Sequence, residues 1–112
     1  MKVSLAERAL GQIDEIASFY FSVRPSLKNE FLEELDATLI LLRANPRIGV
    51  IVSRHHRKLL LRKFPYSVIY EIEEENDRIV ISAVGHQRRR SGSWYNRVEE
   101  FVPAYIVDQL AA

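Results

Sequence analysis

The chain of 112 residues has no cysteine, so neither a disulfide bond nor a thiolate metal site can form. This absence suits a reducing compartment, and we expect the protein in the cytoplasm. The sequence also lacks an apolar run long enough to span a bilayer. Charged residues at Lys2, Glu7 and Arg8 fall where a signal peptide needs its apolar stretch. We therefore expect neither export nor membrane insertion.

Internal repeats and low-complexity tracts are absent as well, and glycine and proline occur only four times each. Hydrophobic residues make up 47% of the chain and charged residues 28%, which is typical of a folded protein and not of a disordered one. A chain of this size forms one modest core. We predict one domain over residues 1–97, with residues 98–112 as its apolar C-terminal tail.

The sequence has almost no excess of charge, because its net charge is only +1, but the charges are unevenly placed. Acidic residues gather between Glu30 and Asp36. Basic residues gather in two later stretches, Arg54, Arg57, Lys58, Arg62 and Lys63, and then Arg88, Arg89, Arg90 and Arg97. The pattern predicts one basic face, which attracts phosphates or an acidic protein segment.

Two helices are predicted in the first half of the chain. Ser4 and Glu7 have the spacing of a capping box, and apolar residues then recur at helical spacing as far as Ser22. A second apolar stripe begins at Pro25 and ends before Asn45 and Pro46. Because the link between the two is so short, the helices must form an antiparallel hairpin.

The second half reads as strands. Three β-rich runs follow a connection from Arg47 to His56, and they are separated by Phe64 and Pro65 and by an acidic turn: Lys58 to Lys63, Tyr66 to Glu73 and Arg78 to Gly85. Alternation places Val68, Tyr70 and Ile72 on one face, and Ile79, Ile81 and Ala83 on one face. The predicted fold is α+β, an N-terminal antiparallel helix hairpin on a three- to four-stranded antiparallel sheet, with residues 2–4 as the possible fourth strand.

Short sequence motifs in the second half of the chain add a family resemblance. Phe64 to Tyr70 form one motif, Val84 to Arg89 a second, and Trp94 and Arg97 follow. In this order and spacing, from about Lys2 to Arg97, the chain resembles the RelE/ParE superfamily, the toxins of bacterial type II toxin-antitoxin modules, and most closely its plasmid-stabilisation or ParE-like branch.

The resemblance implies a small growth inhibitor that a cognate antitoxin neutralises in a hetero-oligomer. Some members cleave messenger RNA on the ribosome, whereas ParE-type members are associated with inhibition of DNA gyrase. No cofactor is implied. We expect a toxin that binds a macromolecular target, with gyrase favoured. The alternatives are a ribonuclease and a non-toxic remnant of the fold.

The ribonuclease alternative depends on one position. RNA cleavage needs a base, an acid and cations at the phosphate, and similar ribonucleases commonly carry an arginine after the aromatic residue of the middle strand. That position is Ser67, which has no charge and disfavours the activity. If the chain is nonetheless a ribonuclease, the candidates are Arg62, His86 and Arg89.

Candidate binding residues surround the same strand ends. For contact with a target or antitoxin we predict Arg62, Lys63, His86, Arg88, Arg89, Arg90, Trp94 and Arg97. Purely structural roles stay open for three of these residues. His86 can hydrogen-bond and fix a turn, Trp94 can pack at the edge of the core, and Arg97 can pair with a carboxylate. His55 and His56 lack a carboxylate or cysteine partner at ligand spacing, so we predict no metal site.

Overall fold

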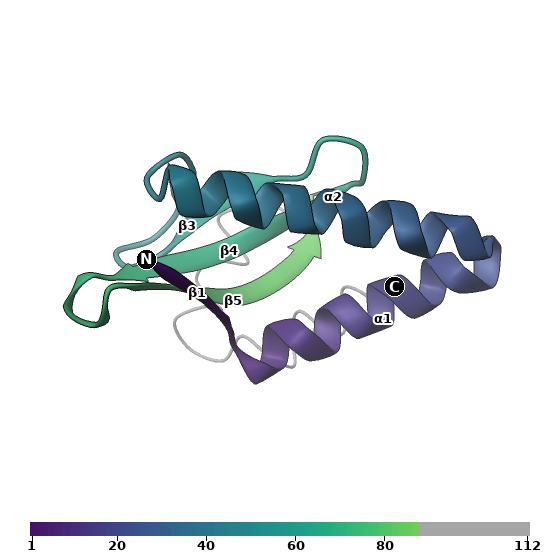
Figure 1. Cartoon of the computed structure of the whole chain (residues 1–112), viewed down its shortest axis with the longest axis horizontal. Helices are drawn as coiled ribbons and strands as arrows, with labels where there is room; N and C mark the ends of the chain where they lie inside the picture. Colours follow the sequence, from purple (N-terminus) through teal and green to yellow (C-terminus); the bar gives the residue numbers. More distant parts are fainter. Residues whose placement is uncertain (88–112) are drawn as a thin grey trace.

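The computed structural model describes residues 1–87, and its first half is the predicted helix hairpin (Figure 1). Helix α1 spans Glu7–Val23 and helix α2 spans Pro25–Ala44. Arg24 joins them with extended backbone, and Pro25 begins α2 at a position where a missing N–H costs nothing. The hairpin and the end of α2 before Asn45 are confirmed.

The sheet has five strands in the order β1-β5-β4-β3-β2. Strand β4 has the predicted bounds, and β5 extends one residue beyond its prediction. The bounds are β1 Lys2–Leu5, β2 Val50–Ile51, β3 Arg57–Leu60, β4 Tyr66–Glu73 and β5 Arg78–His86. The pairs β2/β3, β3/β4 and β4/β5 are antiparallel, whereas β1 joins β5 in parallel. The α+β class is confirmed, with β2 an addition inside the predicted connection.

The predicted capping box at the start of α1 is wrong. Ser4 lies in β1, and the N-cap is Ala6, which makes no side-chain cap bond. The cause is the pairing of β1 with β5, which keeps the backbone extended through Leu5 and continues with Ala6 N–H donating to Ile81 O at 2.9 Å. Sheet pairing therefore overrides the local capping signal.

The core lies between the helices and one face of the sheet. Helix residues such as Ile16, Phe31 and Leu42 pack against alternate residues of β4 and β5. The sheet side of this cluster contains Tyr66, Val68, Tyr70, Ile79, Ile81 and Val84. The predicted face of β4 is thus confirmed, and Ile72 packs against its edge.

One predicted facing in β5 is wrong. Tyr70 pairs with Ile81 but its neighbour Ile69 pairs with Ala83, so Ser82 is an extra residue that bulges β5. Beyond the bulge the alternation is inverted. Val84 and His86 face the helices, and Ala83 faces the opposite side with Ile69.

The connection from α2 to the sheet is fastened by Tyr70. Its hydroxyl donates to Pro46 O at 2.6 Å and accepts from Gly49 N–H at 2.9 Å. A Cβ at Gly49 would lie 2.7 Å from that hydroxyl and 2.8 Å from Lys58 O, so this position needs the smallest residue. Neither helix of the described residues is long and apolar enough to cross a membrane.

Candidate functional site

The three predicted site residues within residues 1–87 lie at one end of the sheet, where the β3–β4 loop meets the end of β5. Gln87 joins the two, because its N–H donates to Pro65 O at 2.8 Å and its Nε2 to the carbonyls of Leu61 and Tyr66 at 3.3 and 3.2 Å. This end of the sheet therefore carries Arg62, Lys63 and His86. The remaining predicted residues, Arg88, Arg89, Arg90, Trp94 and Arg97, lie outside the described residues.

Glu34 of α2 holds the β3–β4 loop in place. One oxygen of its carboxylate accepts the backbone N–H groups of both Arg62 and Lys63, the second at 2.7 Å. Two successive backbone N–H groups form a cradle for an anion, here filled by the protein's own carboxylate. Glu34 is not among the predicted site residues, because an acidic residue on a solvated helix face gives no signal of a partner 28 positions away.

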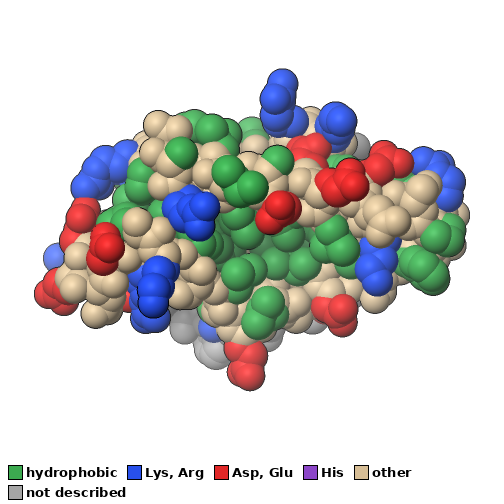
Figure 2. All heavy atoms as spheres, in the orientation of Figure 1, with side chains coloured by type: hydrophobic (Ala, Val, Ile, Leu, Met, Phe, Trp, Pro, Cys, Tyr) green, Lys and Arg blue, Asp and Glu red, His purple; other side chains and the backbone are tan. Residues whose placement is uncertain are grey.

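Arg62 and Lys63 line a groove of about 660 Å³ between this loop and α2. The facing helix wall carries Glu30, Glu33 and Glu34. A phosphate placed in this groove would meet three carboxylates along with the two cations, so the local field does not favour it. The side of α2 that faces the viewer in Figure 2 shows the same mixture, with acidic residues along the helix and hydrophobic ones beneath it.

His86 lies on the helix side of the sheet. It pairs with Tyr66 across the strands, and the two rings meet edge to face with centroids 5.4 Å apart. Tyr66 belongs to an aromatic cluster with Tyr20, Phe31 and Phe64. Burial raises the pKa of Tyr66 well above its usual range, with Tyr20 adding to the shift. The imidazole therefore sits at the rim of a core cluster.

Ser67 lies on the other face. It follows Tyr66 in β4, so its side chain projects away from the helices, and it pairs with Gly85. Its exposed fraction is only 2%. The described residues thus do not bring the Ser67 position, His86 and Arg62 around one point, because the first faces away from the helices and His86 faces toward them.

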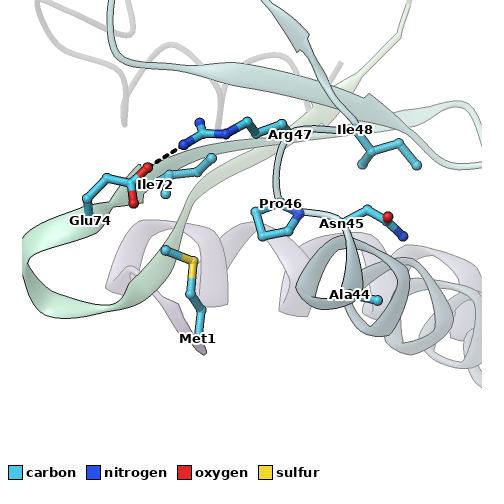
Figure 3. Close-up of a pocket in the computed structure, with 8 residues that line it drawn as sticks. All are labelled: Met1, Ala44, Asn45, Pro46, Arg47, Ile48, Ile72 and Glu74. Atoms are coloured by element: carbon cyan, nitrogen blue, oxygen red, sulfur yellow. Dashed lines mark hydrogen bonds and ion pairs between the residues drawn. The ribbon is translucent and has the colours of Figure 1, made fainter.

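The opposite end of the molecule has two further hollows. One of about 620 Å³ lies where the end of α2 meets the start of β1, and an ion pair of Arg47 with Glu74 crosses its rim (Figure 3). Met1 and Ile72 supply apolar walls to it. The second, about 220 Å³, is polar and contains His55 and His56. Within residues 1–87, no group of three or more His, Cys, Asp or Glu side chains could hold a metal ion.

Comparison with known proteins decides the family. The model of the ParE toxin of type II toxin-antitoxin system, parDE, matches residues 3–91. The chain belongs to the ParE toxin family. No curated protein sequence matches this ParE-family chain.

Solved structures share the fold of this ParE-family chain. The chromosomal ParDE system from P. aeruginosa aligns with a TM-score of 0.67 and 19% identity, covering 77% of this chain and 95% of that one. The isolated E. coli RelE toxin aligns with a TM-score of 0.54 and 20% identity over 88% and 95%. The toxin in the E. coli RelBE toxin-antitoxin complex gives 0.53 and 21% over 79% and 98%. The predicted RelE/ParE resemblance is confirmed.

Proposed function

We propose that this ParE-family toxin acts in the cytoplasm by binding DNA gyrase and stopping its cycle, without breaking a phosphodiester bond itself. The observation that carries the proposal is Ser67, which leaves the middle-strand position without a cation and faces away from the helices, whereas His86 faces toward them. Gyrase as the target follows from the likeness to the ParE branch, in which that enzyme is the associated target.

The positions of these residues matter because cleavage of RNA by its own 2′-hydroxyl requires several groups around a single phosphate. A base, an acid and a cation must all lie within hydrogen-bond reach of the same phosphate, at roughly 3 Å. Here Ser67 is uncharged and faces away from the helices, whereas His86 contacts the Tyr66 ring on the helix side. Arg62 lines a groove whose facing wall carries glutamates. Such an arrangement supports binding better than acid-base catalysis.

A cognate antitoxin is the second proposed partner. Two of the similar structures contain a toxin-antitoxin pair, the ParDE system and the RelBE complex. On this chain, exposed apolar residues on the hairpin offer contact area for such a partner: Phe19, Phe21, Val23, Ile40 and Leu41. An acidic antitoxin segment at Lys63 and at Arg88 to Arg90 would make the affinity fall as salt rises.

Purified full-length toxin tests the mechanism directly. We expect messenger RNA with ribosomes to stay intact in its presence, and gyrase to accumulate on DNA. His86→Ala and Arg89→Ala variants provide the specificity test, and Arg54→Ala, in the loop before β3, is the matched control. RNA cleavage by the wild type that both site variants abolish and the control retains would overturn the proposal.

The ribonuclease stays the second candidate, because Arg62 and His86 do lie at the same end of the sheet. Its signature is the cleavage just described. A non-toxic remnant is distinguished by expression of the chain alone: unaffected colony growth with folded protein in the cells would exclude both toxin mechanisms.

A further inference from the structure

The β3–β4 loop, residues 61–65, fixes its backbone and exposes its two cations. Leu61 N–H donates to Tyr66 O at 2.9 Å, and Tyr66 N–H donates to Phe64 O at 2.8 Å, so hydrogen bonds close the base of the loop. Arg62 and Lys63 form the tip between these bonded residues, and both are exposed. The loop therefore presents two adjacent positive charges.

Helix α2 anchors the loop at two positions about one turn apart. The Phe31 ring packs against the Phe64 ring, with centroids 5.6 Å apart. Three residues later, one carboxylate oxygen of Glu34 accepts the backbone N–H groups of both Arg62 and Lys63. A hydrogen bond to a charged acceptor is roughly twice as strong as a neutral one. The backbone of the tip is thus fixed to the helix as well as to the strands.

The side chains of the tip are not used in this anchoring. Glu34 binds the backbone, and Glu30 and Glu33 face the tip across the groove. Among residues 1–87, no carboxylate forms an ion pair with the guanidinium of Arg62 or the ammonium of Lys63. Both charges are therefore available to an anionic group of a partner.

We propose that Glu34 is a positioning residue for target binding, because it fixes the backbone from which Arg62 and Lys63 reach an anionic surface of the target. The inference rests on the proposed function, since it needs a toxin that acts by binding. A loop already held in one conformation loses less conformational entropy when a partner binds. The charge of Glu34 itself repels an anionic partner, so its favourable effect works only through the loop.

This opposition gives the test its sign. Glu34→Ala removes the acceptor, Glu34→Gln keeps an oxygen that accepts, and Glu33→Ala removes the same charge from the same groove wall. The readout is the level of full-length toxin that halves the growth rate, which assumes no particular target. We expect Glu34→Ala to raise this level roughly tenfold. Glu34→Gln should raise it far less, and Glu33→Ala should not raise it.

A double-mutant cycle separates positioning from a general loss of stability. In an Arg62→Gln/Lys63→Gln background the effect of Glu34→Ala should disappear, because no cation is left to position. Circular dichroism and thermal unfolding verify that each variant folds. The inference is overturned if Glu34→Ala stops growth at the wild-type level, if Glu33→Ala is equally impaired, or if the effect persists in that background. A wild-type chain that does not stop growth would instead overturn the proposed function, and the inference with it.

Discussion

At the scale of the residue, the contact of Gly49 with Tyr70 shows how one small side chain positions a whole connection. The Tyr70 hydroxyl lies close enough to the Gly49 backbone to leave no room for a Cβ. Both of its hydrogen bonds go to the connection that leads from α2 into the sheet. This contact of Gly49 was not predictable from the sequence, since a close approach by a residue 21 positions away leaves no local pattern.

Substitution of that glycine should cost stability. We expect Gly49→Ala to lower the free energy of unfolding by about 1–3 kcal/mol, because the new methyl group overpacks against the Tyr70 hydroxyl and Lys58 O. Gly11→Ala is the control, since nothing lies within 4 Å of its Cβ position in α1. It should raise stability by about 0.5–1 kcal/mol. Chemical denaturation measures both, and equal effects of the two variants would contradict this account of Gly49.

At the scale of the element, a side chain of α1 supplies a hydrogen-bond acceptor to β5 where β1 no longer pairs with it. Strand β1 pairs with β5 only as far as Ile81, and the Gln12 side chain of α1 accepts a hydrogen bond from Val84 N–H, three residues further along β5, at 2.7 Å. Gln12 is fully buried. A single side chain thus closes the edge of β5 beyond the bulge.

Loss of this bond leaves Val84 N–H buried without an acceptor. We expect Gln12→Met, of similar size, to cost about 1–3 kcal/mol of unfolding free energy. Glu15→Met, on the exposed side of the same helix, should change it by less than about 0.5 kcal/mol. A Gln12→Met variant as stable as the wild type in urea denaturation would show that water replaces the amide.

The β4–β5 turn gives a prediction about pH. Hydrogen bonds from Arg78 and then Asn76 lower the pKa of Glu73. A folded-state pKa below the unfolded value contributes stability above the unfolded pKa, which is lost as the pH falls through the folded pKa. Carboxyl NMR titration should therefore find Glu73 below its ordinary value, and Arg78→Gln should raise its pKa. No rise in that variant would rule out Arg78 as the main cause.

Elements were predictable where the pattern is local and strong. The hairpin link at Arg24 and Pro25, the end of α2 and the bounds of β4 follow from proline placement and apolar period. The bulge at Ser82 was not predictable, because strict alternation reads through an inserted residue, and so Ala83 was placed on the wrong face. The Ser67 position and His86 lie on opposite faces for the same reason, since the inverted alternation turns His86 toward the helices.

At the scale of the whole molecule, the charges of residues 1–87 do not form one strong anion-binding site, because several of the cations lie beside carboxylates. The cations of the β3–β4 loop face glutamates of α2, and Arg47 and Arg78 are paired with Glu74 and Glu73. The basic excess of the chain's end then rests on Arg88, Arg89, Arg90 and Arg97. Fold and family could be predicted from sequence, but which charges are neutralised across the fold could not.

Salt dependence checks this view of the partner surface. We expect antitoxin affinity to fall several-fold between low and physiological salt, and to fall further in an Arg88→Gln/Arg90→Gln variant measured at low salt. Arg43→Gln/Arg54→Gln, on the last turn of α2 and in the loop before β3, removes the same two positive charges and serves as the control. Affinity that is constant across salt concentrations would remove electrostatics from the proposed recognition.

The central claim is that the toxin holds its target and does not cut RNA. Induced expression of the wild-type chain, with RNA integrity and plasmid supercoiling followed in the same culture, tests it most directly. The account predicts that supercoiling is lost or gyrase is trapped on DNA while messenger RNA stays intact as growth stops. Fragmented messenger RNA that appears before any change in supercoiling, and that His86→Ala prevents, would contradict it.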